Sequence, residues 1–565
     1  MSLFSREFGY FLIHKIIHFY GDLPYTKKKK GYERKKNMAK QLFFNGPILT
    51  MENPEPAEAL LTENGRILYT GTLSAALSRA YGADKIDLAG KTLMPAFLDA
   101  HGHFFAYANN FLQVSLDGAA DFNEIRKRLL AYTKENNIRP GEWIIAKGYD
   151  HNILAEHTHP DAAFLDSFLP DNPVILHHQS SHMGVFNSKA LKFLQVNGDT
   201  PCPAGGQIAM EKGLPTGYME ETAFVQFAKK VPLPSIDNIL EVCQRAQAVY
   251  ASRGITTVQD GMFVKEMIPI FQRLLAQDNL YLDLVAYIDF QERESISAQF
   301  TSHIRKYNKH FKLGGYKIFL DGSPQGRTAW MRSSYKPESD QHFGTSTMTD
   351  AAVQSALETA AADNMQLLAH CNGDAACAQY ILAAQKATKN GAELSKVRPV
   401  LIHGQLLSPD QIPALKQSCI IPSFFVAHVY HWGDVHIQNF GHERAAKISP
   451  AASALQAGIP FTFHQDSPVI EPDMLETVWC AVTRQTKNGI TLGIEEGVSV
   501  YEALRAVTIN AAYQYFEENE KGSIRPGKSA DFVLLDKNPL ATEPSDLRNI
   551  QILQTVKAGN IIFKK

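Results

Sequence analysis

Three polar residues follow a short apolar run near residue 100. The segment Leu93–Phe104 reads LMPAFLDAHGHF and places Asp99, His101 and His103 directly after strand-forming residues. Because alternate residues of a strand face the same side of a sheet, the two imidazoles are expected to point together. Imidazole nitrogen is a common ligand of divalent transition metals. The segment therefore predicts half of a metal site.

Further ligand-type residues lie in later apolar runs of strand length. These runs are Ile255–Gly261, Leu282–Phe290, Tyr316–Gly322, Met365–Asp374, Pro399–Gln405, Cys419–Phe425 and Ile459–Asp466. Four of these runs contain a residue of ligand type: Lys317, His370, His403 and Asp466. Since barrel enzymes build their sites at the carboxyl ends of parallel strands, these side chains are expected to converge with the His-x-His pair.

The order of the predicted elements indicates an α/β protein with a (β/α)₈ TIM-like barrel over residues 93–521. Helix-compatible segments such as Asp350–Asn364 separate the strand-like runs. The stretch of about 105–231 is too long for a loop and predicts an inserted subdomain after the first strand. Residues 38–92 and 522–565 are rich in short strands and turns, which predicts a small β-sandwich built from both chain ends.

Each candidate ligand also has a structural interpretation. A His-x-His pair by itself can be a surface or core pair. Lys317 can extend to solvent or pair with Asp321 instead of binding a metal. His370 and His403 can be core histidines that hydrogen-bond to the backbone, and Asp466 can be the N-cap of a helix.

Composition and charge are those of a globular protein that does not bind nucleic acid. The chain has 565 residues, 45% of them hydrophobic and 20% charged, and a net charge of −2, so nothing favours a nucleic-acid partner. Its six cysteines form no CxxC pair, which is typical of reduced thiols and predicts a cytoplasmic protein.

The first 37 residues are expected to lie outside the fold. The apolar stretch Phe8–Tyr20 is too short and too interrupted by His and Lys to span a membrane, and a basic run, Lys27–Lys36, follows it. An amphipathic membrane anchor is the alternative. We expect residues 1–37 to be a disordered or non-native extension before Met38, without stable membrane association.

The chain from about residue 40 resembles the metal-dependent amidohydrolase superfamily, and within it the branch of N-substituted formamide deformylase. The matching blocks are LDAHGHF, Tyr316–Met331, Ala369–Ala376, Leu401–Leu407, His464–Val469 and, in the insert, His182–Leu191. The resemblance implies that His101 and His103 bind one metal ion and that His370 and His403 bind a second. It also implies that Lys317 is the lysine that relatives carboxylate as a bridge, and that Asp466 binds metal and transfers the proton.

This resemblance implies a hydrolase of non-peptide C–N bonds, with an N-substituted amide as the expected substrate. Hydroxide formed at one or two divalent ions would attack the carbonyl carbon, and Asp466 would accept the proton as catalytic base. Zinc is favoured because it suits mixed imidazole and carboxylate ligands. His182, Arg327 and Trp330 are predicted to contact a small-molecule substrate. A homodimer is a possible oligomeric state.

The remaining histidines have no ligand role in this interpretation. His464 stands where relatives often have Gly-Ser before the aspartate, and we expect it to line the pocket or support a ligand. The others are predicted to be loop or pocket-rim residues: His151, His157, His159, His177, His178, His428, His431 and His436.

Two other functions compete with this interpretation. The first is a ring aminohydrolase or deaminase; deaminating members of the resembled superfamily have an acid three residues after the fifth-strand histidine, where this chain has Gly373, with Asp374 one position further. A non-catalytic binding protein on the same barrel is the other alternative, and it is disfavoured because the whole ligand set is present.

Overall fold

The computed structural model describes residues 40–565 except 181, 233, 338 and 340. The expectation for residues 1–37 lies outside these residues. The chain divides into two compact units, one that ends at Ala106 and resumes over Ala246–Lys565, and one formed by Tyr107–Arg245. Within the described part of the chain, no helix is both long and apolar enough to cross a membrane.

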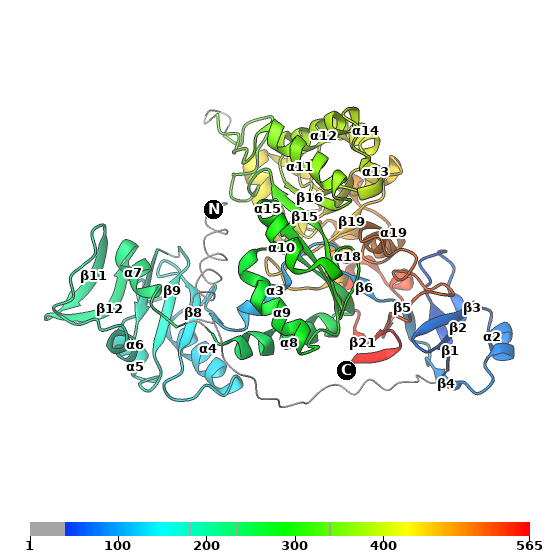
Figure 1. The fold of residues 1–565 in the computed structure, drawn as a ribbon. Helices are drawn as coiled ribbons and strands as arrows, with labels where there is room; N and C mark the ends of the chain where they lie inside the picture. Colours follow the sequence, from blue (N-terminus) through cyan, green and yellow to red (C-terminus); the bar gives the residue numbers. More distant parts are fainter. Residues whose placement is uncertain (1–39, 181, 233, 338, 340) are drawn as a thin grey trace. The chain divides into compact units, whose positions relative to one another are not determined.

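The first unit contains an eight-stranded parallel sheet whose strands follow one another in chain order. They are β6 (Phe97–Leu98), β13 (Ile255–Phe263), β14 (Asp283–Asp289), β15 (Phe311–Phe319), β16 (Gln366–Cys371), β17 (Val400–His403), β18 (Ile421–Phe424) and β19 (Thr462–Phe463). Helices such as α9 (Ile268–Ala276), α11 (Asp350–Ala362) and α12 (Asp374–Lys389) connect them (Figure 1). This is the α/β architecture of a TIM-like barrel.

Backbone hydrogen bonds join the segments that follow the first and the last strand of this sheet. Asp466 N donates to His101 O at 3.1 Å, and His103 N donates to Ser467 O at 2.8 Å. The loops after β6 and β19 therefore lie side by side, although they are far apart in the sequence. This pairing places the His-x-His pair next to Asp466.

The barrel strands differ from the sequence expectation in two places. The apolar run that begins at Leu93 divides between β5 (Thr92–Pro95), which belongs to another sheet, and the two-residue strand β6. Both pieces are buried on both faces, so no polar alternation marks the change of sheet. Strand β15 begins at Phe311 and not at Tyr316. The sequence hid this start because Lys312 is polar, and only the structure shows that it is buried against Glu517.

The two ends of the described chain meet in a second eight-stranded sheet. Its order is β22-β21-β20-β5-β1-β2-β3, with β4 paired to β1. Its strands are β1 (Gln41–Ile48), β2 (Ala57–Glu63), β3 (Arg66–Gly71), β4 (Asp84–Asp87), β5, β20 (Phe532–Leu535), β21 (Ile552–Lys557) and β22 (Asn560–Lys564). Figure 1 shows the blue and red strands together. The description of this region as a sandwich stays a prediction.

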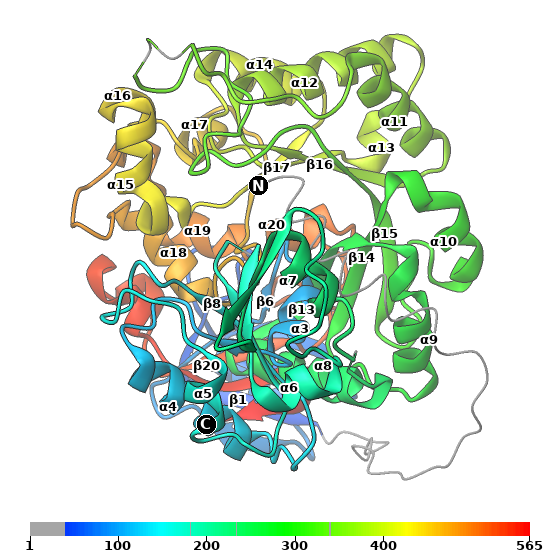
Figure 2. The ribbon, with the colours of Figure 1, turned by 90° about the vertical axis from the view of Figure 1, so that its left-hand side faces the viewer.

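The unit Tyr107–Arg245 has its own six-stranded sheet, in the order β11-β12-β10-β9-β8-β7. The strands are β7 (Val114–Ser115), β8 (Ile144–Tyr149), β9 (Val174–His178), β10 (Met183–Phe186), β11 (Gly206–Glu211) and β12 (Leu214–Glu220), drawn in cyan to green in Figure 2. Two apolar clusters form its core, one around Leu129 and Leu176 and one around Phe186 and Phe224. The domain boundaries expected from the sequence stay predictions.

Candidate metal centre

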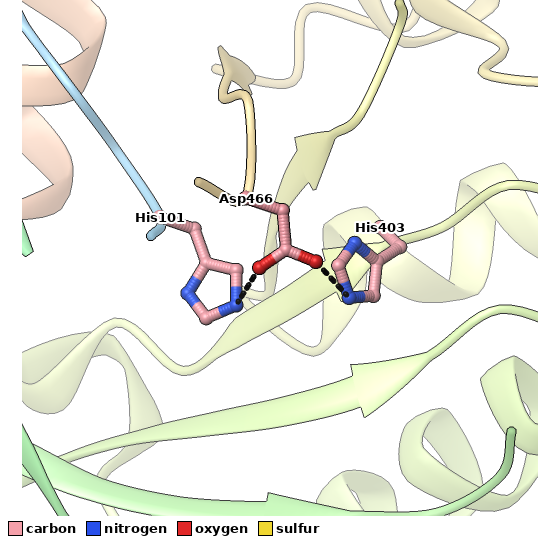
Figure 3. A group of neighbouring side chains, drawn as sticks. All are labelled: His101, His403 and Asp466. Atoms are coloured by element: carbon pink, nitrogen blue, oxygen red, sulfur yellow. Dashed lines mark ion pairs between the residues drawn. The ribbon is translucent and has the colours of Figure 1, made fainter. Parts of the chain in front are cut away.

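Histidine nitrogens converge on the carboxylate of Asp466. Figure 3 shows His101, His403 and Asp466, whose ligand atoms all lie within 4.8 Å of one another. The Asp466 Oδ1 atom is 3.5 Å from His101 Nε2 and 3.3 Å from His103 Nε2, and Oδ2 is 3.8 Å from His403 Nε2. His101 and His103 follow β6 and do not lie in it, so their common direction comes from the loop and not from strand alternation.

Two of these residues adopt a backbone conformation that non-glycine residues rarely take. His403, at the end of β17, has a φ of 73°, and Asp466, just after β19, has a φ of 54°. Left-handed backbone costs free energy for a residue with a Cβ atom, and such residues gather at functional sites. The fold therefore keeps a locally unfavourable conformation at the positions that aim these side chains inward.

His370 joins the group through His403. Its Nδ1 atom is 3.1 Å from His403 Nε2, and its Nε2 atom lies 3.1 Å from Gly322 O. Because a carbonyl oxygen only accepts hydrogen bonds, His370 carries its proton on Nε2, and the lone pair of Nδ1 faces His403. His370 Nδ1 therefore offers a lone pair, which can accept a hydrogen bond from His403 Nε2 or bind an ion.

Lys317 lies in β15 with its amine inside the same cluster. Its side chain is 1% exposed, and Nζ is 3.3 Å from His101 Nε2. Burial lowers the pKa of Lys317 to about 8, although the nearby Asp466 opposes this shift. A lysine with so low a pKa has a neutral fraction near pH 7, which carboxylation of the amine requires.

The charge states of the cluster fit a divalent metal ion. Burial lowers the pKa of His370 to about 4 and holds the pKa values of His101 and His403 well below their usual range, so these rings are neutral and offer lone pairs. Burial would raise the pKa of Asp466, but the hydrogen bond with His103 opposes it, and the pKa lies well below its usual range, so the carboxylate is ionised. Neutral imidazoles with one carboxylate are a donor set that zinc and similar ions prefer.

Gln259 in β13 orients His101, a role that sequence reasoning missed. Its Nε2 donates to Ala100 O at 2.8 Å and to Tyr515 Oη at 2.9 Å, so its Oε1 accepts from His101 Nδ1, 2.5 Å away. This arrangement puts the His101 proton on Nδ1 and leaves Nε2 free toward Asp466. The available signal in the sequence was a glutamine inside a predicted strand, and the structure leaves that side chain 1% exposed.

His464, which directly follows β19, supports His403 at the end of β17. Its Nε2 lies 3.1 Å from His403 Nδ1, and its Nδ1 lies 2.9 Å from Ser423 Oγ. This chain of contacts fixes the ring plane of His403, since both ring nitrogens of His464 have partners. The sequence predicted that His464 would line the pocket or support a ligand, and it gave no sign of Ser423.

His428 and His436 lie in a different place from the one expected. Both are buried in helix α15 (His428–Phe440), where His428 Nδ1 is 3.1 Å from His436 Nε2. The expectation of a loop is therefore wrong for this pair, as it is for His431 in the same helix and for His177 and His178 in β9, and a place at a pocket rim stays a prediction. The spacing of eight residues puts His428 and His436 on one face of a helix, and the aromatic stretch around them concealed that periodicity.

The predicted substrate-binding residues lie in separate segments. Trp330 N donates to Asp321 Oδ2 at 3.0 Å, and Asp321 Oδ1 is 3.7 Å from His370 Nε2, so the loop after β15 is fastened beside the cluster. The Arg327 guanidinium lies 5.6 Å from the ring centre of Tyr335. His182 belongs to the other unit, where its Nδ1 is 3.1 Å from Glu221 Oε2. Their roles toward a substrate stay predictions.

Comparisons with known proteins agree on one family. Residues 84–563 match the amidohydrolase family. An N-substituted formamide deformylase of Arthrobacter pascens is 27% identical over 534 residues, which cover 90% of this chain and 95% of that protein. Protein LONG AFTER FAR-RED 3 of Arabidopsis thaliana is 28% identical over 548 residues, 93% of this chain and 92% of that protein.

A solved structure supports the fold. The crystal structure of an uncharacterized metal-dependent hydrolase from Pyrococcus furiosus superimposes with a TM-score of 0.71 at 24% identity. The match covers 89% of this chain and 100% of that chain. At this level of identity the likeness supports the architecture alone.

Proposed function

The chain belongs to the amidohydrolase family, and on that premise we propose that it hydrolyses the C–N bond of an N-substituted amide. It is a metal-dependent hydrolase acting on carbon–nitrogen bonds. The formamide deformylase of Arthrobacter pascens, which this chain matches over most of its length, supports an N-substituted amide as the substrate class. The observation that carries the proposal is the convergence of His101, His403 and Asp466 on one point.

The residues of this cluster would hold one or two divalent ions, with zinc as the proposed metal. His101, His103 and Asp466 would hold one ion, His370 and His403 a second, and carboxylated Lys317 would link them. A metal bound there polarises the substrate carbonyl and lowers the pKa of water from about 15.7 toward about 7. The donor set supports ligation, because neutral imidazoles grouped around one ionised carboxylate suit a divalent ion.

Asp466 is the proposed general base. Its carboxylate is ionised, as its pKa lies well below the usual range, so it can accept a proton from water and deliver it to the leaving nitrogen. Gln259 and His464 would act as positioning residues for His101 and His403. We propose that Arg327, Trp330 and His182 contact the substrate.

The wider assignment follows from the same premise. We propose a cytoplasmic enzyme of small-molecule substrates, with a composite β-sandwich over 38–92 and 522–565. The barrel would cover 93–521, with an insert over about 105–231. Burial of the cysteines at 243, 371, 377 and 480, without disulfides, supports a reducing location.

The geometry around Gly373 disfavours ring deamination. A Cβ atom on Gly373 would lie 1.9 Å from Trp330 O, so no acidic side chain fits there without a shift of the backbone. Asp374 is at the start of α12, where its Oδ1 accepts from Arg332 N at 2.8 Å. The acid that the deaminase alternative needs is therefore missing from its position.

Hydrolysis assays on the full chain test the proposal. The protein, loaded with zinc, is offered N-substituted formamides, larger N-substituted amides and amino-substituted purines, and release of the free amine or of ammonia is measured. Amine release from the amides that is lost in Asp466→Asn and kept in His157→Asn, an exposed residue, is the expected result. Ammonia release from purines without amide hydrolysis would favour the deaminase alternative.

A further inference from the structure

A second group of metal-ligand side chains lies within the unit Tyr107–Arg245. Asp150 and His151 directly follow β8, and His178 ends β9. The two strands pair in parallel with Tyr149 opposite His178, so their carboxyl ends meet at one edge of the sheet. Side chains that follow neighbouring parallel strands gather at that edge, which is where α/β sheets commonly bind ligands.

The potential ligand atoms are separated by the distances that one metal ion imposes. His151 Nδ1 is 3.1 Å from His178 Nε2, and Asp150 Oδ1 is 3.5 Å from His178 Nε2 and 3.9 Å from His151 Nδ1. Ligands at about 2.0–2.1 Å from a tetrahedral zinc ion are roughly 3.3 Å apart. The three atoms therefore need only small side-chain movements to share an ion.

We propose that Asp150, His151 and His178 bind a divalent transition metal ion at a site separate from the barrel cluster. Two imidazoles and one carboxylate favour zinc, cobalt or nickel over calcium or magnesium, which prefer oxygen ligands. Three protein ligands leave at least one coordination position for water. The site rests on residues of this unit alone and does not depend on the proposed amidase activity.

Neighbouring side chains orient the His151 ring. It stacks on His159, with ring centres 4.0 Å apart and an angle of 28° between the planes. His159 is itself held by Tyr149, because its Nδ1 lies 3.0 Å from the Tyr149 hydroxyl. A ring that is stacked in this way loses less rotational freedom when it binds an ion.

Ser180 supports His178. Its Oγ lies 2.9 Å from His178 Nδ1, and its backbone N–H donates to the same nitrogen at 3.1 Å. A metal on Nε2 places the ring proton on Nδ1, and this N–H can donate a hydrogen bond to Ser180 Oγ. Metal binding thus exchanges the Ser180 N–H bond for an Nδ1–H···Oγ bond.

The group is open enough for an ion to enter and buried enough to hold it. The side chain of His178 is 8% exposed, that of Asp150 20% and that of His151 30%. One edge of the group therefore meets solvent, while His178 anchors it in the sheet. An ion can bind without opening of the core.

Cobalt spectroscopy of a cysteine variant tests the site directly. His178→Cys in the full chain replaces an imidazole by a thiolate, which gives a near-ultraviolet charge-transfer band when it binds Co²⁺. We expect this band on titration with Co²⁺. The matched control, His157→Cys, places a thiol at an exposed position of the same unit and is expected to give the wild-type spectrum.

Metal stoichiometry gives a second, independent measurement. Metal-free full chain is titrated with Zn²⁺ and analysed by elemental mass spectrometry after removal of free ion. His178→Ala and His151→Ala are each expected to bind one equivalent fewer than wild type and His157→Asn. Far-ultraviolet circular dichroism verifies that the variants are folded.

Two results would overturn the site. One is an unchanged number of zinc equivalents in folded His178→Ala and His151→Ala. The other is a His178→Cys spectrum with Co²⁺ that equals that of His157→Cys. Neither result would bear on the amidase assays, which depend on the barrel cluster.

Discussion

The barrel sheet buries ionisable groups at both of its ends, and the pKa of a buried lysine is shifted in opposite directions at the two ends. At the carboxyl end, Lys317 faces His101, and burial lowers its pKa to about 8. At the amino end, Lys521 Nζ lies 2.5 Å from Asp283 Oδ2 and 2.9 Å from Glu517 Oε2. Burial alone would lower the pKa of Lys521, but the two carboxylates outweigh it and raise the pKa above its usual range.

The amino-end group is a closed network that we call the basal cluster; it consists of Asp283, Lys312, Glu517, Lys521 and Lys557. Each cation there contacts a carboxylate, whereas at the other end the Lys317 amine lies against the imidazole of His101 and the carboxylate of Asp466 is surrounded by histidines. Contact with two carboxylates thus raises the pKa of Lys521, whereas burial lowers the pKa of Lys317 and gives it a neutral fraction near pH 7. The first arrangement stabilises the fold, and the second provides reactive groups.

The largest effect is expected at the carboxyl end. Asp466→Asn keeps the shape and one ligand oxygen but cannot accept a proton, so the turnover rate should fall by a factor of about 10²–10⁴. The metal content and the melting temperature should change little. Steady-state kinetics with elemental analysis verify this, and normal turnover would assign the proton transfer to another group.

Removal of the basal carboxylate should act on stability and not on catalysis. Asp283→Ala leaves Lys521 and Lys557 buried without this partner, which should destabilise the fold by about 3–5 kcal/mol. Urea unfolding measures the loss, and kcat of the folded variant should remain at the wild-type value. A comparable fall in kcat would mean that the two ends are coupled.

Arginine substitutions separate the two lysines. Arginine stays charged in proteins, so Lys317→Arg should lose the bridging group and at least one metal equivalent. Lys521→Arg keeps its charge beside Asp283 and should retain the full metal content. Short carboxylic acids are expected to restore part of the activity in Lys317→Ala. Full metal content in Lys317→Arg would show that this lysine has a structural role.

Loss of the Gln259 contact should weaken metal binding without abolishing it. Gln259→Leu removes the acceptor for His101 Nδ1, and we expect zinc affinity to fall by a factor of about 10–100. Gln259→Glu keeps an acceptor at this position and should bind zinc more tightly than the leucine variant. Competition with a chelator measures both affinities; equal affinities of the two variants would count against the orienting role.

The smallest effect concerns the acid stability of the basal cluster. Burial would raise the pKa of Asp283, but Lys521 and Lys557 hold it well below its usual range. A lowered folded-state pKa gives stability that is fully present above the unfolded value of about 3.9 and is lost as the pH falls through the folded value. The stability difference between wild type and Asp283→Asn should therefore be constant near neutral pH and shrink below about pH 4. Urea unfolding over this pH range measures it, and a difference that does not change with pH would contradict it.

The order of strands and the candidate ligands could be predicted because they follow from local patterns. Apolar runs of strand length, each followed by helix-compatible sequence, were enough to anticipate β13 to β19. The boundary between β5 and β6 could not be predicted, since a run that is buried in two successive sheets has no alternation. The start of β15 was hidden because the ion pair that buries Lys312 involves Glu517, a residue distant in the sequence.

Within the site, the candidate ligands were visible in the sequence, whereas of the residues that support them only His464 was anticipated. The His-x-His pattern and the histidines at strand ends are recognisable by type and spacing. Gln259, Ser423 and Tyr515 act through hydrogen bonds to atoms that only the fold brings near. The group around His178 escaped notice for the same reason, because its members come from two strands that pair only in the folded unit.

The hydrogen bonds between the loops after β6 and β19 have a consequence for synthesis. His101 leaves the ribosome hundreds of residues before Asp466, the partner whose backbone N–H it accepts. Strand β5 likewise waits for β20, its antiparallel neighbour from the other end of the chain. Contacts of such long range form late in folding. In a nascent chain, His101 and His103 are therefore present without the carboxylate of Asp466. The complete metal centre can form only after Asp466 has been synthesised.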